Sequence, residues 1–508
     1  MKTLDVVVGG NFGSEAKGHM TQRLAERRSK QMADSGEESA VEVIRVAGPN
    51  AGHTGHDSEG KPWAFRQLPV AAVIESPVVF GSGSVQVILG IAAGSEVDPE
   101  VLLDEIDRAR AAGLLDDKSV WVSEEVTLIT EEHRAREADA DLVARVGSTG
   151  KGIGAARADR VMRTAKRLAD DDAVRASLET RGIQIMPAGW SSATDMMPWL
   201  DQTSIIVEGA QGYGLGLHAG HYPQSTSSDC RAIDFLAMAG INPWNYDEEV
   251  FNVWVVARVY PIRVAGNSGE LKGETTWDQL GLKEERTTVT KLVRRVGEPD
   301  WPHVSEAIKA NGPMNVRLAV FMYDQMFPET FETTSVYTWS REAEDYLDEI
   351  ERETGLRPTL VGTGPNSVAW LDWSEGTVQK RLDLNMEAVA RRNQEVEAEA
   401  DSAEQEDDYL QWWADTSREI ANMVVPKARE YGSRDLIEIG QEVATLAGRG
   451  EVSEGYAYEL GVFVYLRGKV SRWSAAARRG ELVSKDTLDD TIAYAMMALH
   501  NRHLNNNG

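Results

Sequence analysis

The sequence predicts an α/β protein with a mostly parallel central sheet and flanking helices, followed by an all-α helical domain. Short apolar runs alternate with helical patterns through the first three-quarters of the chain, and the runs lack polar alternation. Strands that are covered on both faces have this pattern, and their alternation with helices favours a parallel sheet. The candidate strands are Leu4–Val8, Val41–Val46, Val85–Leu89, Ser204–Val207, Val253–Val264 and Val316–Tyr323.

Helical stretches such as His19–Gln31 and Pro99–Ala112 lie between the candidate strands. Three strands run directly into glycine-rich or polar loops: GGNFGSEAKG after Val8, AGPNAGHT after Val46 and EGAQG after Val207. Ligands of open parallel sheets bind outside the carboxyl ends of the strands. We therefore expect a functional site where these three loops meet.

Composition excludes several classes of protein. The 508 residues include 53 Lys and Arg against 81 Asp and Glu, a net charge of −28 that argues against nucleic acid as a partner. Cys230 is the only cysteine, which excludes an intramolecular disulfide. Because the start of the chain lacks a signal-peptide pattern and no apolar run approaches 18 residues, we expect a cytoplasmic protein without membrane contact. For a phage-encoded protein, this would be the host cytoplasm.

The chain divides by pattern into residues 1–374, an acidic linker at 375–408 and an all-α domain at 409–508. Within the linker, Glu395–Asp408 holds eight acidic residues in fourteen and no basic one, which is typical of a solvated helix face or a tether. Beyond it, apolar residues recur at three- and four-residue spacing, as in amphipathic helices.

The opening loop, Gly9–Gly18, follows a strand and leads into a helix. Glycines let the backbone approach phosphate oxygens, the helix N-terminus adds partial positive charge, and Lys17 can add a full charge. The spacing is not that of a Walker A loop, and a purely structural turn is an equally good interpretation. In the second loop, His53 could donate a proton or a hydrogen bond to a phosphoryl group. A histidine with only a backbone partner is the alternative.

Taken together, the motifs resemble those of the adenylosuccinate synthetase family. The opening loop is similar to the family's GDEGKG, and Asn50–Thr54 to its NNAGHT. Val146–Gly154 (VGSTGKGIG) is similar to GTTGRGIGP, and Glu208–Gly212 (EGAQG) is the strongest match. The resemblance covers about 370 residues in the family's order and continues at Arg160–Arg163, Tyr222-Pro223, Thr226–Ser228, Arg263-Val264, Thr287–Arg295 and Gly362–Pro365 (GTGP).

The family phosphorylates the 6-oxygen of a purine nucleotide with a nucleoside triphosphate and then displaces the phosphate with aspartate. The resemblance implies catalytic roles for Ser14, Lys17, His53 and Gln211. It implies Mg²⁺ as cofactor, held by Ser14 and the Gly52 carbonyl. Residues implied to hold the purine nucleotide are Gly13, Ser14, Asn50, Ala51, Thr149, Lys151, Gln211, Thr226 and Val264, with Arg163 reaching across a homodimer. Those implied to bind aspartate are Thr288, Val289, Thr290 and Arg294. Those implied to bind the phosphate donor are Gly13, Glu15, Ala16, Lys17, Gly18, Thr54, Asp324, Gly362, Gly364 and Pro365.

The most informative departure from the family is Ser14, which stands where the family has a catalytic aspartate. A serine is a poor base, so one interpretation is a decayed, inactive enzyme. The other is a changed substrate, because a hydroxyl leaves room for the 2-amino group of guanine. In this respect the sequence resembles the phage-type 2-aminoadenylosuccinate synthetases, which act on dGMP. The retained Lys17, His53 and Gln211 argue against decay.

Two further departures concern the sugar and the phosphate donor. Lys291-Leu292 replaces a Gly-Arg pair of the family, and an apolar Leu292 could suit a 2′-deoxyribose, although a simple surface leucine is as good an interpretation. Phe321–Asp324 (FMYD) replaces the family's TKLD, so that the lysine packed on the guanine of GTP is lost. ATP or dATP is therefore the expected donor.

The segment Tyr431–Leu499 is foreign to the synthetase family and resembles small all-α MazG-like nucleotide pyrophosphohydrolases. Acidic residues on helices could bind Mg²⁺ there. The alternative is an exposed helix surface without metal or catalysis. The candidate ligands are Glu438, Glu442, Glu459, Asp486, Asp489 and Asp490.

The sequence thus predicts a Mg²⁺-dependent ligase that joins L-aspartate to C6 of dGMP at the expense of ATP or dATP. Three rival hypotheses stay open. The first is an ordinary synthetase that acts on IMP with GTP. The second is a nucleotide-binding protein with an inactive synthetase fold, and the third is a bifunctional enzyme whose C-terminal half hydrolyses nucleoside triphosphates.

Overall fold

In a computed structural model, the chain falls into two compact units, residues 1–378 and 379–508. The predicted boundaries at residues 374 and 408 lie outside the described residues, so the division into three parts stays a prediction. The structure describes residues 3–35, 39–75, 85–192, 203–247, 250–287, 292–312, 315–371, 433–446 and 451–478, together with Thr487, Thr491 and Ala495.

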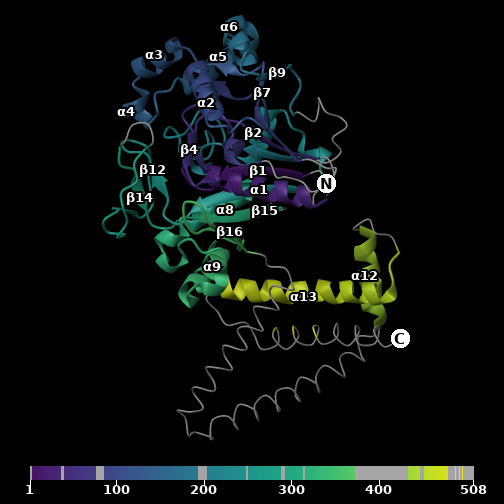
Figure 1. The fold of residues 1–508 in the computed structure, drawn as a ribbon. Coiled ribbons are helices and arrows are strands. Elements are labelled where there is room, and N and C mark those ends of the chain that lie inside the picture. The colour runs from purple at the N-terminus through teal and green to yellow at the C-terminus, as the bar shows by residue number, and fades with distance from the viewer. Residues whose placement is uncertain are drawn as a thin grey trace. The chain divides into compact units, whose positions relative to one another are not determined.

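Within the described part of the first unit, one large sheet has the strand order β17-β16-β15-β11-β1-β10-β2-β5-β7-β9. All neighbours pair in parallel except β17, which runs antiparallel to β16. Figure 1 shows this sheet running from β9 and β7 to β16, with β1 near its middle. The strands are β1 (Thr3–Gly9), β2 (Ser39–Arg45), β5 (Val85–Ile91), β7 (Lys118–Ser123), β9 (Gln184–Met186), β10 (Thr203–Glu208), β11 (Phe251–Arg258), β15 (Val316–Phe321), β16 (Pro358–Gly362) and β17 (Val368–Trp370).

The predicted fold class is confirmed, but one expected strand is too long. The expected strand Val253–Val264 is wrong as a single element, because β11 ends at Arg258 and the chain enters a second sheet as β12 (Ile262–Arg263). Pro261 lies at this break, where its missing N–H and fixed φ interrupt a strand. The other five expected strands are present, with ends within two residues of those predicted.

Helices cover both faces of the sheet, so an apolar core cluster lies on each face. Val6 and Val8 of β1 belong to one apolar cluster and Val7 to the other, as the alternation of side chains along a strand requires. The helices α1 (Lys17–Ser35) and α2 (Pro99–Ala111) pack on the Val7 side. On the opposite side lie α7 (Ala232–Ala239), α8 (Trp301–Ala310) and α9 (Arg341–Thr354).

Smaller elements surround this layered core. The strands β3 (His53–His56) and β4 (Pro62–Phe65) form a hairpin, and β6 (Glu96–Val97) pairs with β8 (Thr127–Leu128). A second antiparallel sheet contains β12, β13 (Glu274–Thr275) and β14 (Arg295–Gly297). The remaining helices are α3 (Glu131–Asp139), α4 (Leu142–Val146), α5 (Ile153–Met162) and α6 (Asp172–Glu179).

The described part of the second unit is helical, as predicted. The helices α12 (Ser433–Leu446) and α13 (Glu454–Arg478) pack closely, because a Cβ on Gly461 would overlap the Leu436 carbonyl oxygen. Among the residues that the structure describes, no helix has the length and apolar character needed to cross a membrane.

Candidate active site

Three loops meet at the carboxyl edge of the sheet, after the neighbouring strands β1, β10 and β2. Two close approaches bring them together. A Cβ on Gly18 would lie 2.7 Å from the Cβ of His53, and one on Gly9 would lie 2.6 Å from the Gln211 carbonyl oxygen. Only glycine fits at such distances. The structure therefore gathers the opening loop, His53 and Gln211 in one place, where ligands of parallel sheets bind.

Glu15 organises the opening loop. It is fully buried, and its Oε1 accepts hydrogen bonds of 2.8 Å from the backbone N–H groups of Asn11 and Gly13. Its Oε2 accepts from Lys17 Nζ at 2.5 Å, and the Lys17 side chain is itself 2% exposed. The buried ammonium is therefore paired with a carboxylate in the absence of substrate. Because the N–H groups of Asn11 and Gly13 already donate to Glu15, the loop can offer phosphate only its other backbone N–H groups and the Lys17 ammonium.

His53 begins β3 and contacts a carboxylate at the end of β10. Its Nδ1 lies 2.5 Å from Glu208 Oε1, and the same oxygen pairs with Arg45 Nη1. Glu208 Oε2 accepts a hydrogen bond of 2.9 Å from the Val70 N–H, so that both carboxylate oxygens are occupied. Glu208 and Arg45 are register partners in neighbouring strands, and Arg45 also donates to the Ala51 carbonyl. The predicted residue Ala51 is thus part of the wall that fixes His53.

The electrostatics of this cluster set the protonation of His53. Burial and the positive charge of Arg45 lower the pKa of His53 to about 4, although Glu208 opposes them. Burial alone would raise the pKa of Glu208, but Arg45 and His53 outweigh it and hold the pKa below its ordinary value. At neutral pH the imidazole is therefore neutral. Its Nδ1 lies 2.5 Å from Glu208 Oε1 and 2.9 Å from Arg45 Nη1, and these two contacts orient the ring.

Ser14 lies at the tip of the opening loop, with an exposed side chain and a φ of 56°. Its Oγ accepts a hydrogen bond of 2.6 Å from Arg294 Nη1, which ties the predicted aspartate loop to the opening loop. Its carbonyl accepts from Arg258, whose buried guanidinium pairs with Glu285 at 2.6 Å. The other residues predicted to bind aspartate lie outside the described residues; they are Thr288, Val289 and Thr290.

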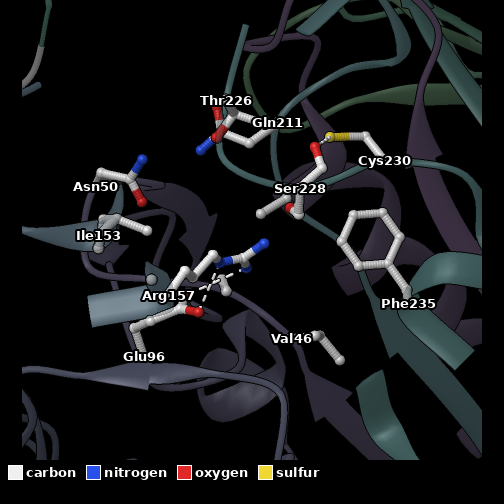
Figure 2. A pocket seen from close by; sticks show the side chains of 13 residues that line it. Val46, Asn50, Glu96, Ile153, Arg157, Gln211, Thr226, Ser228, Cys230 and Phe235 are labelled. Atoms are coloured by element: carbon white, nitrogen blue, oxygen red, sulfur yellow. Dashed lines mark hydrogen bonds and ion pairs between the residues drawn. The ribbon is translucent and has the colours of Figure 1, made fainter. Parts of the chain in front are cut away.

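A small pocket, with a cavity volume of about 20 Å³, opens beside these loops (Figure 2). Three of the residues predicted to hold the nucleotide, Asn50, Gln211 and Thr226, line it. Cys230 also lines the pocket, and burial raises the pKa of its thiol to about 12, so it is a neutral wall group. Polar and aromatic lining residues that the sequence analysis did not name are Glu96, Arg157 and Phe235.

The structure places the other predicted nucleotide ligands outside this lining. Thr149 and Arg163 are exposed near the two ends of α5, and Lys151 is half-buried just before that helix. Val264 follows β12, and its carbonyl accepts a hydrogen bond from Ser268. None of these four residues lines the pocket with Asn50 and Gln211.

The residues predicted to bind the donor divide between two places. Gly13, Ala16, Lys17, Gly18 and Thr54 lie in or beside the opening loop. Asp324, Gly362, Gly364 and Pro365 follow the carboxyl ends of β15 and β16. Asp324 is half-buried, and burial raises the pKa of its carboxyl. Because β15 is separated from β1 by β11 alone, both groups lie along one edge of the sheet.

The predicted magnesium ligands offer neutral oxygen atoms. The Ser14 hydroxyl accepts from Arg294, and Gly52 is exposed, with only Arg66 near the position of a Cβ. Hydroxyl and carbonyl oxygens suit Mg²⁺, but they bring no negative charge. This donor set therefore fits the ion only when phosphate oxygens of the substrates complete its coordination.

The acidic residues predicted to bind metal in the second unit are mostly open to solvent where they are described. Glu438 and Glu442 are exposed on α12, and Glu459 is half-buried on α13. Asp486, Asp489 and Asp490 lie outside the described residues. Within the described ranges, no group of three or more His, Cys, Asp or Glu side chains could hold a metal ion.

Comparison with known proteins bears on the fold and on this site. The sequence profile described as adenylosuccinate synthetase matches residues 6–188 and 190–326. The adenylosuccinate synthetase of Pyrococcus horikoshii is 33% identical over 364 residues, which are 71% of this chain and 95% of that protein. The chain belongs to the adenylosuccinate synthetase family. The enzyme of Methanocaldococcus jannaschii is 30% identical over 73% of this chain and 96% of its own length.

Two solved structures of synthetases align with the chain. Cyanophage S-2L succinoaminodeoxyadenylate synthetase (PurZ), bound to dGMP and to dATP as an energy donor, is 28% identical, with a TM-score of 0.56 over 73% of this chain and 95% of its own. The fully ligated adenylosuccinate synthetase from Plasmodium falciparum is 17% identical, with a TM-score of 0.57. The alignment covers 73% of this chain and 100% of that structure. The latter supports the fold alone. As a member of this family, the chain is a C–N bond-forming ligase.

Sequence reasoning missed the residues that hold the synthetase site in place. The sequence analysis names Glu208 only as the first residue of the EGAQG motif and includes Arg45 only within the expected strand Val41–Val46, although both residues contact His53. Their positions at the carboxyl ends of buried strands were a usable signal, because a charge buried there requires a partner. Glu96 and Arg157 are 61 residues apart, and no local pattern indicates their pairing.

Proposed function

We propose that the chain condenses L-aspartate with C6 of dGMP, at the expense of ATP or dATP, to give N6-succino-2-amino-2′-deoxyadenylate, a precursor of 2-aminoadenine. The observation that carries this proposal is the contact between Ser14 and Arg294, at the position where the family has an aspartate. A hydroxyl in this position accepts a hydrogen bond and bears no charge. A carboxylate there would meet Arg294 as an ion pair and would occupy more space.

The size and polarity of Ser14 suit a guanine ring. Guanine differs from hypoxanthine by a 2-amino group next to N1. A hydroxyl is smaller than a carboxylate with its hydration shell, and it can accept a hydrogen bond from that amine. The cyanophage synthetase, which was solved with dGMP, supports the same substrate class at 28% identity. The curated relatives, at about 30% identity, are named adenylosuccinate synthetases and leave the ordinary substrate as the rival.

The reaction has two steps. The 6-oxygen of the purine attacks the γ-phosphorus of the donor while the N1 proton passes to water. One O–P bond forms, the bond from the γ-phosphorus to the bridging oxygen breaks, and the nucleoside diphosphate leaves. The aspartate amine then attacks C6, and inorganic phosphate leaves. Phosphoryl transfer needs positioning and charge neutralisation, which Lys17, the backbone of the opening loop and Gln211 supply. Magnesium, held by Ser14, the Gly52 carbonyl and phosphate oxygens, would neutralise the charge of the donor phosphates.

His53 contributes through its orientation and its proton. Glu208 and Arg45 both contact Nδ1 and fix the imidazole, so Nε2 is the atom left to meet a phosphoryl oxygen. Donor phosphates would bring negative charge beside the ring and raise its affinity for a proton. Protonated in this way, His53 can donate to the transferring group, and Glu208 stabilises the imidazolium that forms.

A homodimer would complete the site. Arg163 is exposed within one chain, consistent with reaching a nucleotide in a neighbouring subunit. The two residues before it, Val161 and Met162, are 71% and 70% exposed, and apolar side chains at such exposure favour coverage by a partner. Light scattering of the purified chain at micromolar concentration would test the dimer.

The deciding experiment is phosphate release from ATP and aspartate with dGMP, GMP, dIMP and IMP side by side, with product masses confirmed. Selective turnover of dGMP supports the proposal, and turnover of IMP alone overturns it in favour of an ordinary synthetase. Absence of turnover with every monophosphate would favour an inactive fold. Repeating the assay with dATP and GTP tests the donor that Phe321–Asp324 indicates.

A further inference from the structure

A buried ion pair in the nucleotide pocket has no role in the function proposed above. Arg157 on α5 donates from Nε to Glu96 Oε1 at 2.6 Å and from Nη2 to Glu96 Oε2 at 3.2 Å. The Glu96 residue is 4% exposed, and the Arg157 side chain is 20% exposed. Both line the pocket that Asn50, Gln211 and Thr226 also line. Among the described lining residues, Arg157 is the only cation.

Arg157 keeps hydrogen-bonding capacity on the side that faces the pocket. A guanidinium carries five N–H groups in a planar fork, and the pair with Glu96 uses two of them. Within the described part of the chain, Nη1 has no hydrogen-bond acceptor at a normal distance. Figure 2 shows the guanidinium extending from the Glu96 side into the space between Asn50 and Phe235. The pair therefore orients Arg157 without saturating it.

The position of the chemistry determines which part of a nucleotide could reach Arg157. Transfer to the 6-oxygen must take place beside Lys17 and His53, and the Gln211 loop approaches the opening loop at Gly9. In Figure 2, Gln211 and Thr226 lie on one side of the pocket, and the pair of Arg157 with Glu96 lies across from them. A nucleotide whose C6 is near Gln211 would extend its sugar and phosphate away from that edge.

We propose that Arg157 binds the 5′-phosphate of the purine nucleotide from within the same chain, and that Glu96 is its positioning residue. The inference rests on the proposed function, because it takes a purine monophosphate as the ligand. Planar guanidinium groups bind phosphate through paired hydrogen bonds. Asn50, Thr226 and Ser228 add neutral donors around the same space. This contact is separate from that of Arg163, which the dimer would supply.

Glu96 compensates the charge of Arg157 within the pocket. Burying a guanidinium without a partner is unfavourable, and the carboxylate offsets this desolvation while leaving Nη1 open. Burial raises the pKa of Glu96, and Arg157 opposes this rise. Removing Arg157 alone would leave a buried carboxylate unpaired, so a single substitution could destabilise the fold.

The test therefore removes both charges together. In Glu96→Gln/Arg157→Gln the two amides can still pair, and replacing a buried ion pair by neutral groups is often tolerated. Titration calorimetry of the full-length chain measures the Kd of dGMP and of deoxyguanosine, which lacks the phosphate. We expect the Kd of dGMP to rise about 10- to 100-fold, and that of deoxyguanosine to change by less than about threefold. Arg157→Lys, which keeps the charge and loses the fork, should lie between the variant and the wild type.

A matched control is Arg134→Gln. Arg134 pairs with Asp98 at 2.6 Å, two residues beyond Glu96, and neither lines the pocket. The affinity of the Arg134→Gln variant for dGMP should equal that of the wild type. Equal losses for dGMP and deoxyguanosine would show a structural role and overturn the inference, as would an unchanged affinity for dGMP.

The outcome also separates this inference from the proposed substrate. If IMP proves to be the substrate, the same titrations with IMP and inosine test Arg157. If the wild type and the double variant bind a monophosphate equally well, the role of Arg157 is overturned and the proposed function is not. Failure of the wild-type chain to bind either monophosphate would overturn both proposals.

Discussion

The two sides of the candidate site are built in opposite ways. On the side proposed to bind phosphate, Lys17 and His53 are buried and bonded to carboxylates that are themselves fully buried, Glu15 and Glu208. On the side proposed to select the substrate, the Ser14 side chain is exposed and meets Arg294 through a single hydrogen bond. The phosphate side is a network of charges, whereas the selecting side is one polar contact.

This difference shows where the specificity of such an enzyme can change. Breaking a buried ion pair leaves an uncompensated charge, so the phosphate side tolerates little variation. An exposed hydroxyl can be exchanged at little cost to folding. Ser14 can therefore differ from the family's aspartate while Lys17, His53 and Glu208 stay in place. Under the proposed function, Lys17 would serve the phosphoryl transfer and Ser14 the choice of substrate, only three residues apart in the same loop.

The largest effect should follow the loss of Glu208. Glu208→Ala leaves Arg45 without its carboxylate partner, the Val70 N–H without an acceptor and His53 without its carboxylate contact. We expect a loss of about 3–5 kcal/mol in the free energy of unfolding and a fall of about 100-fold or more in kcat. Urea denaturation and phosphate release measure the two effects.

Two further variants make this result specific. Glu274→Ala removes an exposed carboxylate that pairs with Arg295, and should cost about 1 kcal/mol or less. Glu208→Gln keeps the shape of the side chain and should fold better than Glu208→Ala while still losing activity. A Glu208→Gln enzyme with normal kcat would show that the carboxylate does not act through His53.

The second effect concerns the selecting side and should leave folding almost unchanged. In Ser14→Asp, a carboxylate meets Arg294 and crowds the 2-amino edge of guanine. We expect kcat/KM for dGMP to fall about 100-fold, which corresponds to a lost contact plus a clash, and kcat/KM for IMP to rise. Parallel assays with both nucleotides give the ratio. Ser14→Ala keeps the space and removes the acceptor, so a large loss with dGMP in that variant would show that the hydrogen bond, rather than the space, selects guanine.

The third effect is a dependence of stability on pH. Burial lowers the pKa of His19 to about 3, and burial with Arg45 lowers that of His53 to about 4. An unfolded chain takes up these protons near pH 6.5, whereas the folded chain takes them up only well below it. The folded state should therefore lose stability as the pH falls from about 6.5 to 4, and His19 alone contributes on the order of 2–3 kcal/mol.

His19→Gln tests this window. Glutamine can still accept the hydrogen bond that Arg23 donates to His19 Nε2 at 3.1 Å, but it does not titrate. Urea unfolding at pH 7, 5.5 and 4.5 should show a flatter decline in this variant than in the wild type. Identical pH profiles would mean that His19 does not contribute to acid lability.

The same division between buried networks and local contacts explains what the sequence could predict. Strand positions followed from apolar runs such as Leu4–Val8, and the meeting of the three loops followed from their places at strand ends. The break inside Val253–Val264 was predictable from Pro261 and was missed. The pairings of Glu208 with Arg45 and of Glu96 with Arg157 depend on strand order and helix packing. A single sequence does not reveal such contacts between residues that lie far apart along the chain.

The smallest effect should come from Cys230, which lines the nucleotide pocket but is a neutral wall group. Cys230→Ala should keep kcat and the KM for dGMP within about threefold of the wild type, because the thiol stays protonated and contributes only packing. As the single cysteine, Cys230 also reports on the pocket through its own reactivity. With a pKa of about 12, a small fraction is thiolate at pH 8, and thiol reagents should react about 1,000-fold more slowly than after unfolding.

The rate of Cys230 modification can be compared with and without each nucleotide, which tests where dGMP and ATP bind. Saturating dGMP should slow the modification of Cys230 further, since the ligand fills the pocket that Cys230 lines. ATP alone should slow it less, because the donor is expected along the opening loop and the ends of β15 and β16. Equal protection by the two nucleotides would show that the pocket does not distinguish substrate from donor, and would move the purine site away from Asn50, Gln211 and Thr226. Fast modification of Cys230 in the native chain would instead show that the pocket opens widely enough for the reagent to reach this thiol.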